Sequence, residues 1–215
     1  HQVLKKQINA LPYPSLSMEY KLEGNVLTLE KNLSNLDKFV FKFIKKLDVQ
    51  KLNYVIISGY IPILFGRSRE TEDVDLFLEK PSFEEFKKLW ESLQEEFDCI
   101  NAFSAKEAYA DYLTQGIAIS FSLKNNFIPN IEVKFAKTGL NQHSLDNKIK
   151  AIVNGTQLFI SNLEMQIAFK LYLGSDKDIE DAIHLWTIFK KDLDKTKLNE
   201  YAKILKVTQK LGELE

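Results

Sequence analysis

Apolar and polar residues alternate near the start of the chain and then change to helical spacing. Residues 18–30 alternate on either side of Glu23-Gly24-Asn25, which is typical of a β-hairpin with a tight turn. Ser34 can cap the helix that follows, because the apolar positions from Leu36 to Leu47 keep to one helical face. Residues 1–50 therefore predict a hairpin and a helix that pack on a larger core.

The middle of the chain, residues 51–138, predicts a mixed α/β core. Gly59 opens a turn into a short helix, and Pro81-Ser82 begins a longer amphipathic one. Two of the predicted strands alternate in the manner of antiparallel neighbours, and the other two are short apolar runs expected to be buried. In chain order the predicted strands lie at residues 53–58, 74–78, 117–123 and 130–136.

The remainder, residues 139–215, is mainly helical. A small hairpin is expected around Asn154-Gly155, and Gly174-Ser175 supplies a helix stop followed by a cap. Three helical stretches are predicted, at residues 162–173, 176–190 and 194–206. Together the segments predict an α+β fold, in which a mixed sheet is flanked by helices and a helical C-terminal part completes the site.

Composition is ordinary for a soluble globular protein. The chain of 215 residues is 45% hydrophobic, and its formal net charge of −1 gives no overall attraction to nucleic acid or to a membrane. Cys99 is the sole cysteine, so a reducing, cytoplasmic location is expected. No apolar run approaches the roughly 20 residues that span a bilayer. Local attraction to nucleic acid could come from one lysine cluster, although such a cluster is more often a solvated face: Lys134, Lys137, Lys148 and Lys150.

Arginine is confined to one short segment. Among 29 lysines and arginines, Arg67 and Arg69 are the two arginines of the chain. Arginine binds phosphate or carboxylate through two parallel hydrogen bonds, which lysine cannot form. We therefore expect this segment to bind phosphate, with Arg67, between Gly66 and Ser68, as the freer of the two. Arg69 could instead pair with an acidic neighbour, namely Glu70, Glu72 or Asp73.

Paired carboxylates follow the arginines. Asp73 and Asp75 project from the same face of a predicted strand, and a divalent cation such as Mg²⁺ would relieve their mutual repulsion. A solvent-facing acidic edge is the commoner origin of Asp-x-Asp. Glu132, inside another apolar strand, favours the metal site, because a third carboxylate would complete a cage for two metals. Asp73 and Asp75 would then bridge both metals, while Glu132 would act as general base for the attacking hydroxyl.

These residues resemble a known family. The runs Ile57-Ser58-Gly59-Tyr60, Asp73-Val74-Asp75-Leu76 and Ile131-Glu132-Val133 resemble the nucleotidyltransferase superfamily related to DNA polymerase β. Farther along, Lys170-Leu171 and residues 174–181 resemble its AbiEii-like, minimal branch. The resemblance covers roughly residues 55–190. It implies transfer of a nucleotide from a nucleoside triphosphate to an acceptor hydroxyl, with Mg²⁺ or, in its place, Mn²⁺.

The resemblance also implies roles for individual residues. Metal ligation falls to Asp73, Asp75 and Glu132. Contact with the nucleotide or its phosphates falls to Gly59, Tyr60, Arg67, Ser68, Arg69, Lys170 and Asp178. Lys170 could equally extend to water, and Asp178 could simply stabilise a helix N-terminus. Tyr60 departs from the family pattern, because its ring stands where Gly or Ser is usual and is expected to add bulk there.

Three functions remain open from the sequence. The first is a toxin-like nucleotidyltransferase acting on RNA, such as a tRNA 3′ end, or on a protein hydroxyl, with an antitoxin as a partner. The second is a module that binds a nucleotide or a partner without catalysis; Tyr60 favours it, whereas the intact carboxylate set disfavours it. The third is nucleotidylation of a small molecule, as in antibiotic-modifying enzymes.

Overall fold

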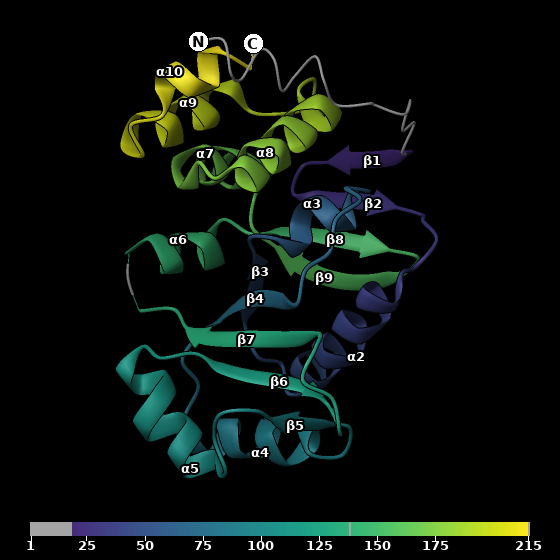
Figure 1. Cartoon of the computed structure of the whole chain (residues 1–215), viewed down its shortest axis with the longest axis vertical. Helices are drawn as coiled ribbons and strands as arrows, with labels where there is room; N and C mark the ends of the chain where they lie inside the picture. The colour runs from purple at the N-terminus through teal and green to yellow at the C-terminus, as the bar shows by residue number, and fades with distance from the viewer. Residues whose placement is uncertain (1–18, 138, 215) are drawn as a thin grey trace.

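The computed structural model describes residues 19–137 and 139–214, and a mixed sheet of nine strands runs through this part of the chain (Figure 1). In spatial order the strands are β1 (Tyr20–Glu23), β2 (Val26–Leu29), β8 (Ile149–Val153), β9 (Thr156–Ile160), β3 (Tyr54–Ile57), β4 (Asp73–Leu78), β7 (Asn130–Phe135), β6 (Ile119–Leu123) and β5 (Phe97–Cys99). Strands from the start, middle and end of the chain therefore share one sheet.

Helices cover the sheet and gather at its two ends. They are α2 (Asn35–Val49), α3 (Tyr60–Leu64), α4 (Phe83–Leu93), α5 (Ala105–Glu107), α6 (Gly139–Asp146), α7 (Leu163–Leu173), α8 (Asp176–Phe189), α9 (Lys195–Ile204) and α10 (Thr208–Gly212). Figure 1 shows α7 to α10 gathered at the end of the sheet that holds β1, and α4 and α5 beside β5 at the other end. Within the described ranges, none of the helices combines the length and apolar character needed for a membrane span.

The predicted α+β fold, a mixed sheet with a helical C-terminal part, is confirmed. The hairpins around Gly24 and Asn154-Gly155 are β1–β2 and β8–β9, and β6 pairs with β7 in antiparallel fashion as expected. Ser34 caps α2 by accepting a hydrogen bond from the Asp37 amide over 3.1 Å. Six of the described elements lacked a prediction: β5, α5, α6, α10, the π-helical turn Ala108–Tyr112 and the 3₁₀ turn Leu113–Gln115.

The two central strands β4 and β7 have one apolar and one polar face. Val74, Leu76 and Leu78 of β4 are buried, as are the alternate residues of β7. Aromatic side chains of α2 and α4 cover this apolar face. For example, Phe86 of α4 packs on Phe135 of β7 with ring centroids 6.2 Å apart. Because side chains alternate along a strand, the intervening polar residues project from the opposite face.

Candidate active site

The three predicted carboxylates lie on one face of two neighbouring strands. Strands β4 and β7 are parallel, and Asp75 is directly opposite Glu132 in their register. Asp73 lies two residues before Asp75 and therefore shares its face. Neighbouring strands are about 4.8 Å apart, so the side chains of Asp75 and Glu132 leave the sheet side by side. The structure thus places the three residues predicted as metal ligands on one strand face.

The pKa of Asp75 is affected by the neighbouring carboxylates. Burial raises the pKa of its carboxyl, and the negative charge of Asp73, with a smaller effect of Glu132, raises it further. Lys134 and a hydrogen bond from the Ser58 side chain act in the opposite direction without outweighing them. An ionised Asp75 is therefore destabilised by its surroundings, which a bound cation would relieve.

The donor set suits a hard cation such as Mg²⁺, because it consists of carboxylate oxygens beside open solvent. The side chains are not gathered into a finished cage. Among the described residues, no three Asp, Glu, His or Cys side chains are close enough together to hold one ion. The carboxylate of Glu132 is 3.7 Å from the ammonium of Lys134 on the same strand face. The Oε2 atom of Glu132 is therefore shared with Lys134, and a bound cation would compete with that ammonium for it.

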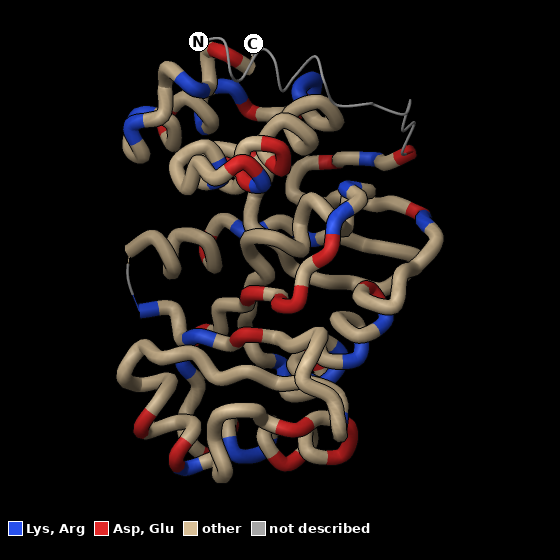
Figure 2. Tube along the Cα trace, in the orientation of Figure 1, with Lys and Arg blue, Asp and Glu red and all other residues tan. Residues whose placement is uncertain are grey.

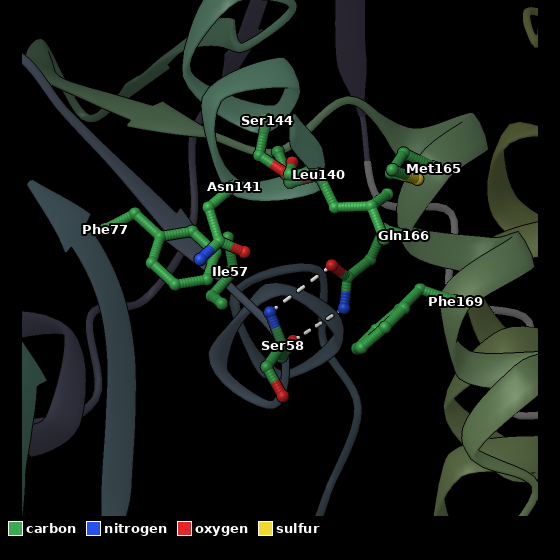
Figure 3. A pocket seen from close by; sticks show the side chains of 10 residues that line it. Ile57, Ser58, Phe77, Leu140, Asn141, Ser144, Met165, Gln166 and Phe169 are labelled. Carbon is green, nitrogen blue, oxygen red and sulfur yellow. Dashed lines mark hydrogen bonds between the residues drawn. The ribbon is translucent and has the colours of Figure 1, made fainter. Parts of the chain in front are cut away.

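Ser58, at the end of β3, takes an unusual backbone conformation next to these carboxylates. Its φ of 63° lies in the left-handed region, which L-residues other than glycine seldom adopt. The Gln166 side chain on α7 holds this turn, accepting from the Ser58 N–H over 3.3 Å and donating to its carbonyl over 2.8 Å (Figure 3). The turn aims the Ser58 hydroxyl at Asp75.

Both arginines are bound to helix α8. The Nε atoms of Arg67 and Arg69 donate to the same oxygen of Asp181, over 3.1 and 3.0 Å, and Arg69 adds a second bond of 3.0 Å from Nη2. Arg67 also pairs with Glu180. Asp181 itself is fully buried. Arg67 is therefore ion-paired, although it makes fewer hydrogen bonds than Arg69, which also donates to the carbonyls of Gly59 and Glu70. The carboxylate that pairs with Arg69 is not that of Glu70, Glu72 or Asp73.

Lys170 extends this network into the protein interior. The residue is 2% exposed, and its ammonium donates to Asp178 over 2.7 Å and lies 3.1 Å from Asp181. It does not reach out to water. Burial raises the pKa of Asp178, but hydrogen bonds from Lys170 and Ser175 outweigh burial and lower it. The Asp178 side chain is therefore a buried ion-pair partner as well as a first-turn acid of α8.

The ion network is balanced in charge. Its cations are Arg67, Arg69 and Lys170, and its anions are Asp178, Glu180 and Asp181. Three positive and three negative charges leave no surplus for a triphosphate in this arrangement. Contact of these residues with a nucleotide stays a prediction, and it would require at least one ion pair to open. Ser68 lies exposed between the two arginines.

Gly59 and Tyr60 begin helix α3. The carbonyl of Gly59 accepts a hydrogen bond from Arg69 over 3.1 Å, and a Cβ on Gly59 would lie 2.7 Å from the same guanidinium. Tyr60 is fully buried, with its hydroxyl donating to Asp37 of α2 over 2.8 Å. The expectation that its ring adds bulk at the triphosphate is wrong, because the ring points into the apolar core.

A pocket of about 100 Å³ lies on the carboxylate face of the sheet, beneath α6 and α7 (Figure 3). Its floor begins beside Asp75, since Ile57 is opposite Asp75 in the register of β3 and β4 and Phe77 is two residues farther along β4. The lining residues are Ile57, Ser58, Phe77, Leu140, Asn141, Ser144, Ser161, Met165, Gln166 and Phe169.

The predicted lysine cluster does not form an open basic patch. Lys148 bonds to the carbonyl of Tyr54 over 3.2 Å and lies over the Phe159 ring, 4.2 Å from its centroid. Lys134 faces Glu132, and Lys137 bonds to the Thr114 carbonyl. Figure 2 shows basic and acidic segments interspersed along the described chain.

Sequence reasoning missed Gln166, Asp181, Lys134 and Asn141 as parts of this site. Lys134 could have been found, because it is two residues beyond Glu132 and shares its strand face. Asp181 belongs to the segment 174–181 that carries the family resemblance, but its pairing with Arg69, 112 residues earlier, has no local signal. Gln166 has no local signal either, since its partner Ser58 lies 108 residues earlier.

The family described as nucleotidyl transferase of unknown function (DUF2204) matches residues 37–211. The chain belongs to this family. A search of curated proteins gave no significant match. Among solved structures, the DUF2204 chain is similar to an antigenic nucleotidyltransferase-like protein from Paracoccidioides brasiliensis, at 18% identity over 82% of this chain and 90% of that one, with a TM-score of 0.53.

A second similar structure is ANT(2″)-Ia in complex with adenylyl-2″-tobramycin. It is 14% identical over 80% of the DUF2204 chain and 98% of its own, with a TM-score of 0.53. At these identities the likeness concerns the fold, and the predicted nucleotidyltransferase-like fold is confirmed.

Proposed function

We propose that this DUF2204 protein is an Mg²⁺-dependent nucleotidyltransferase, which transfers a nucleoside monophosphate from a nucleoside triphosphate to an acceptor hydroxyl. One observation carries the proposal: Asp75 and Glu132 are opposite each other on parallel strands, with Asp73 on the same face. The raised pKa of Asp75 adds support, because perturbed carboxylates collect at functional sites.

The chemistry follows from the position of each carboxylate. Bound Mg²⁺ would neutralise phosphate charge and polarise the reacting oxygens. Asp73 and Asp75 would hold the ions, and Glu132 would take the proton of the acceptor hydroxyl. The acceptor oxygen then forms a bond to the α-phosphorus, the bond from that phosphorus to the bridging oxygen breaks, and pyrophosphate leaves. Lys134 would be released from Glu132 in the same event and could meet a phosphate oxygen.

The proposal leaves several classes of acceptor to be distinguished by experiment. An RNA end such as a tRNA 3′ end, or a protein hydroxyl, fits the narrower AbiEii-like resemblance, with a toxin-like role and an antitoxin partner. The interspersed charges give little support for an extended RNA footprint. A small-molecule hydroxyl is supported by the fold shared with ANT(2″)-Ia, whose structure is a complex with adenylyl-2″-tobramycin.

A second candidate is a nucleotide- or partner-binding module without catalysis. The balanced ion network favours it, since Arg67, Arg69 and Lys170 are already paired. The buried position of Tyr60 removes the earlier reason for this candidate, because the ring does not obstruct the carboxylate face.

Two measurements test the proposal. Calorimetry measures the binding of each nucleoside triphosphate with Mg²⁺, and a labelling assay measures transfer of labelled nucleotide to bulk RNA, to lysate protein and to aminoglycosides. We expect Mg²⁺-dependent binding and labelling that both disappear in the Asp75→Asn variant. Binding without labelling of any acceptor would favour the module. Absence of Mg²⁺-dependent nucleotide binding would overturn the enzyme and leave the partner-binding form of the module.

A further inference from the structure

The pocket beneath α6 and α7 has one polar group left without a partner. Ser144 donates to the Leu140 carbonyl over 3.1 Å, and the Gln166 amide is occupied by both backbone groups of Ser58. The side-chain amide of Asn141 makes no hydrogen bond within the described chain. Figure 3 shows this amide directed into the space between Phe77 and Gln166.

The remaining walls of the pocket are apolar and partly aromatic. Ile57 and Phe77 rise from the sheet, and Met165 and Phe169 descend from α7. Binding sites for whole drug-sized molecules occupy roughly 300–1,000 Å³, so a pocket of about 100 Å³ suits a single planar ring system better than a complete aminoglycoside or nucleotide. A flat ring between apolar walls, with one amide at its edge, is the chemistry of nucleobase recognition.

The location of the pocket distinguishes donor from acceptor. The pocket lies next to Asp75 on the side of β3, whereas Glu132 lies next to Asp75 on the side of β7. If Glu132 takes the acceptor proton, the acceptor approaches from the β7 side. The β3 side, with Ser58 and the pocket, is then left for the nucleoside triphosphate.

We propose that this pocket binds the adenine ring of the donor nucleotide, and that Asn141 on α6 recognises the polar edge of that ring. The inference rests on the proposed function. An asparagine amide offers one donor and one acceptor side by side, which match the N6 amino group and N7 of adenine. Asn141 is then a specificity-determining residue, and α6 is the element that selects the nucleotide.

The test compares ATP, the other three nucleoside triphosphates and inorganic triphosphate, each with Mg²⁺, by calorimetry on the full chain. The variants are Asn141→Ala and Phe169→Leu. The control is Gln142→Ala, which is the next residue of α6 and loses a hydrogen bond to Asp146 outside the pocket. Melting temperatures of all variants show whether the fold is retained. Adenosine alone, titrated without metal, probes the pocket independently of the carboxylates.

We expect ATP to bind most tightly and Asn141→Ala to weaken ATP roughly tenfold, as for loss of a bidentate base contact. The affinity of Asn141→Ala for inorganic triphosphate should equal that of wild type. The affinity of Gln142→Ala for ATP should also equal that of wild type. The inference is overturned if the folded variants Asn141→Ala and Phe169→Leu bind ATP as tightly as wild type. It is also overturned if their affinity for inorganic triphosphate falls as much as their affinity for ATP, or if wild type binds a nucleoside triphosphate with another base more tightly than ATP. If that happens while Mg²⁺-dependent transfer persists, the proposed function stands without it.

Discussion

The side chain of Gln166 is bonded to both backbone polar groups of Ser58, across a sequence separation of 108 residues. Gln166 is 2% exposed, so water does not compete for these two bonds. Because Gln166 holds Ser58 at a φ of 63° and the Ser58 side chain interacts with Asp75, helix α7 acts on the Asp75 carboxylate through Ser58. Gln166 is therefore a positioning residue.

Replacement of Gln166 by methionine tests this role, since methionine has a similar shape but no amide. The variant would leave the Ser58 N–H without its acceptor and the Ser58 carbonyl with the Ile61 N–H as its remaining donor, which should lower the free energy of unfolding by about 1–3 kcal/mol. In the proposed reaction we expect a lower kcat with KM changed less. The half-buried Gln142, which lies outside the pocket lining, gives the control variant Gln142→Met, measured by urea denaturation and steady-state kinetics. Equal effects of the two substitutions would contradict the role.

Replacement of Asp75 by asparagine should stabilise the metal-free protein at neutral pH while it removes Mg²⁺-dependent nucleotide binding. The native state holds a proton on Asp75 more tightly than the unfolded chain, since burial and Asp73 raise its pKa. Stability is therefore lost as pH rises from the unfolded pKa of about 3.9 through the raised folded pKa, and it stays lost above that range.

Thermal unfolding between pH 4 and pH 8 measures the difference. The advantage of Asp75→Asn over wild type should grow as pH rises through the acidic range and then level off. The surface variant Asp98→Asn is the control and should show no such growth. A melting temperature below that of wild type at pH 7, in the absence of metal, would contradict the raised pKa.

Loss of the Arg69 guanidinium should destabilise the fold. Arg69→Met breaks two bonds to fully buried Asp181 and one to the Gly59 carbonyl, and we expect a loss of about 3 kcal/mol in the free energy of unfolding. The exposed pair Lys87–Glu91 provides a control, because Lys87→Met should cost less than about 0.5 kcal/mol. Unchanged stability together with weaker ATP affinity would instead show that Arg69 leaves Asp181 to bind phosphate.

Removal of the Tyr60 hydroxyl should lower the free energy of unfolding and should not change nucleotide affinity. Tyr60→Phe deletes one donor to the buried carboxylate of Asp37, which should cost about 1–2 kcal/mol in unfolding free energy. The affinity for Mg²⁺-ATP should not change, since the ring lies in the core. Tyr172→Phe, on an exposed tyrosine, is the control for both measurements. A weaker ATP affinity in Tyr60→Phe would instead indicate that Tyr60 contributes to nucleotide binding.

The carboxylate row was predictable because its signal is local. Period-two alternation around Asp73, Asp75 and Glu132 fixes which face each side chain takes, and neighbouring apolar residues fix the buried face. The register that brings Asp75 opposite Glu132 cannot be predicted from the sequence of either strand alone. It depends on β7 pairing with β4, for which the sequence offered a plausible pattern but no proof.

The partners of the arginines were not predictable from the same sequence. An acidic neighbour in the chain looked sufficient for Arg69, yet Asp181 lies 112 residues away on α8. Tyr60 was misplaced because the left-handed turn at Ser58, which sets how α3 begins, depends on distant Gln166. Helix α6 was missed because few apolar residues mark it, although one of its polar residues, Asn141, lines the pocket.

The position of β8 and β9 in the sheet bears on the order in which the protein can assemble. Val26 of β2 pairs with Lys150 of β8, and Ile56 of β3 pairs with Ile160 of β9. During synthesis, both β2 and β3 therefore expose an unpaired edge until residues 149–160 have left the ribosome. Such edges are prone to pairing with other chains, so aggregation is most to be expected in nascent or truncated forms that end before β9.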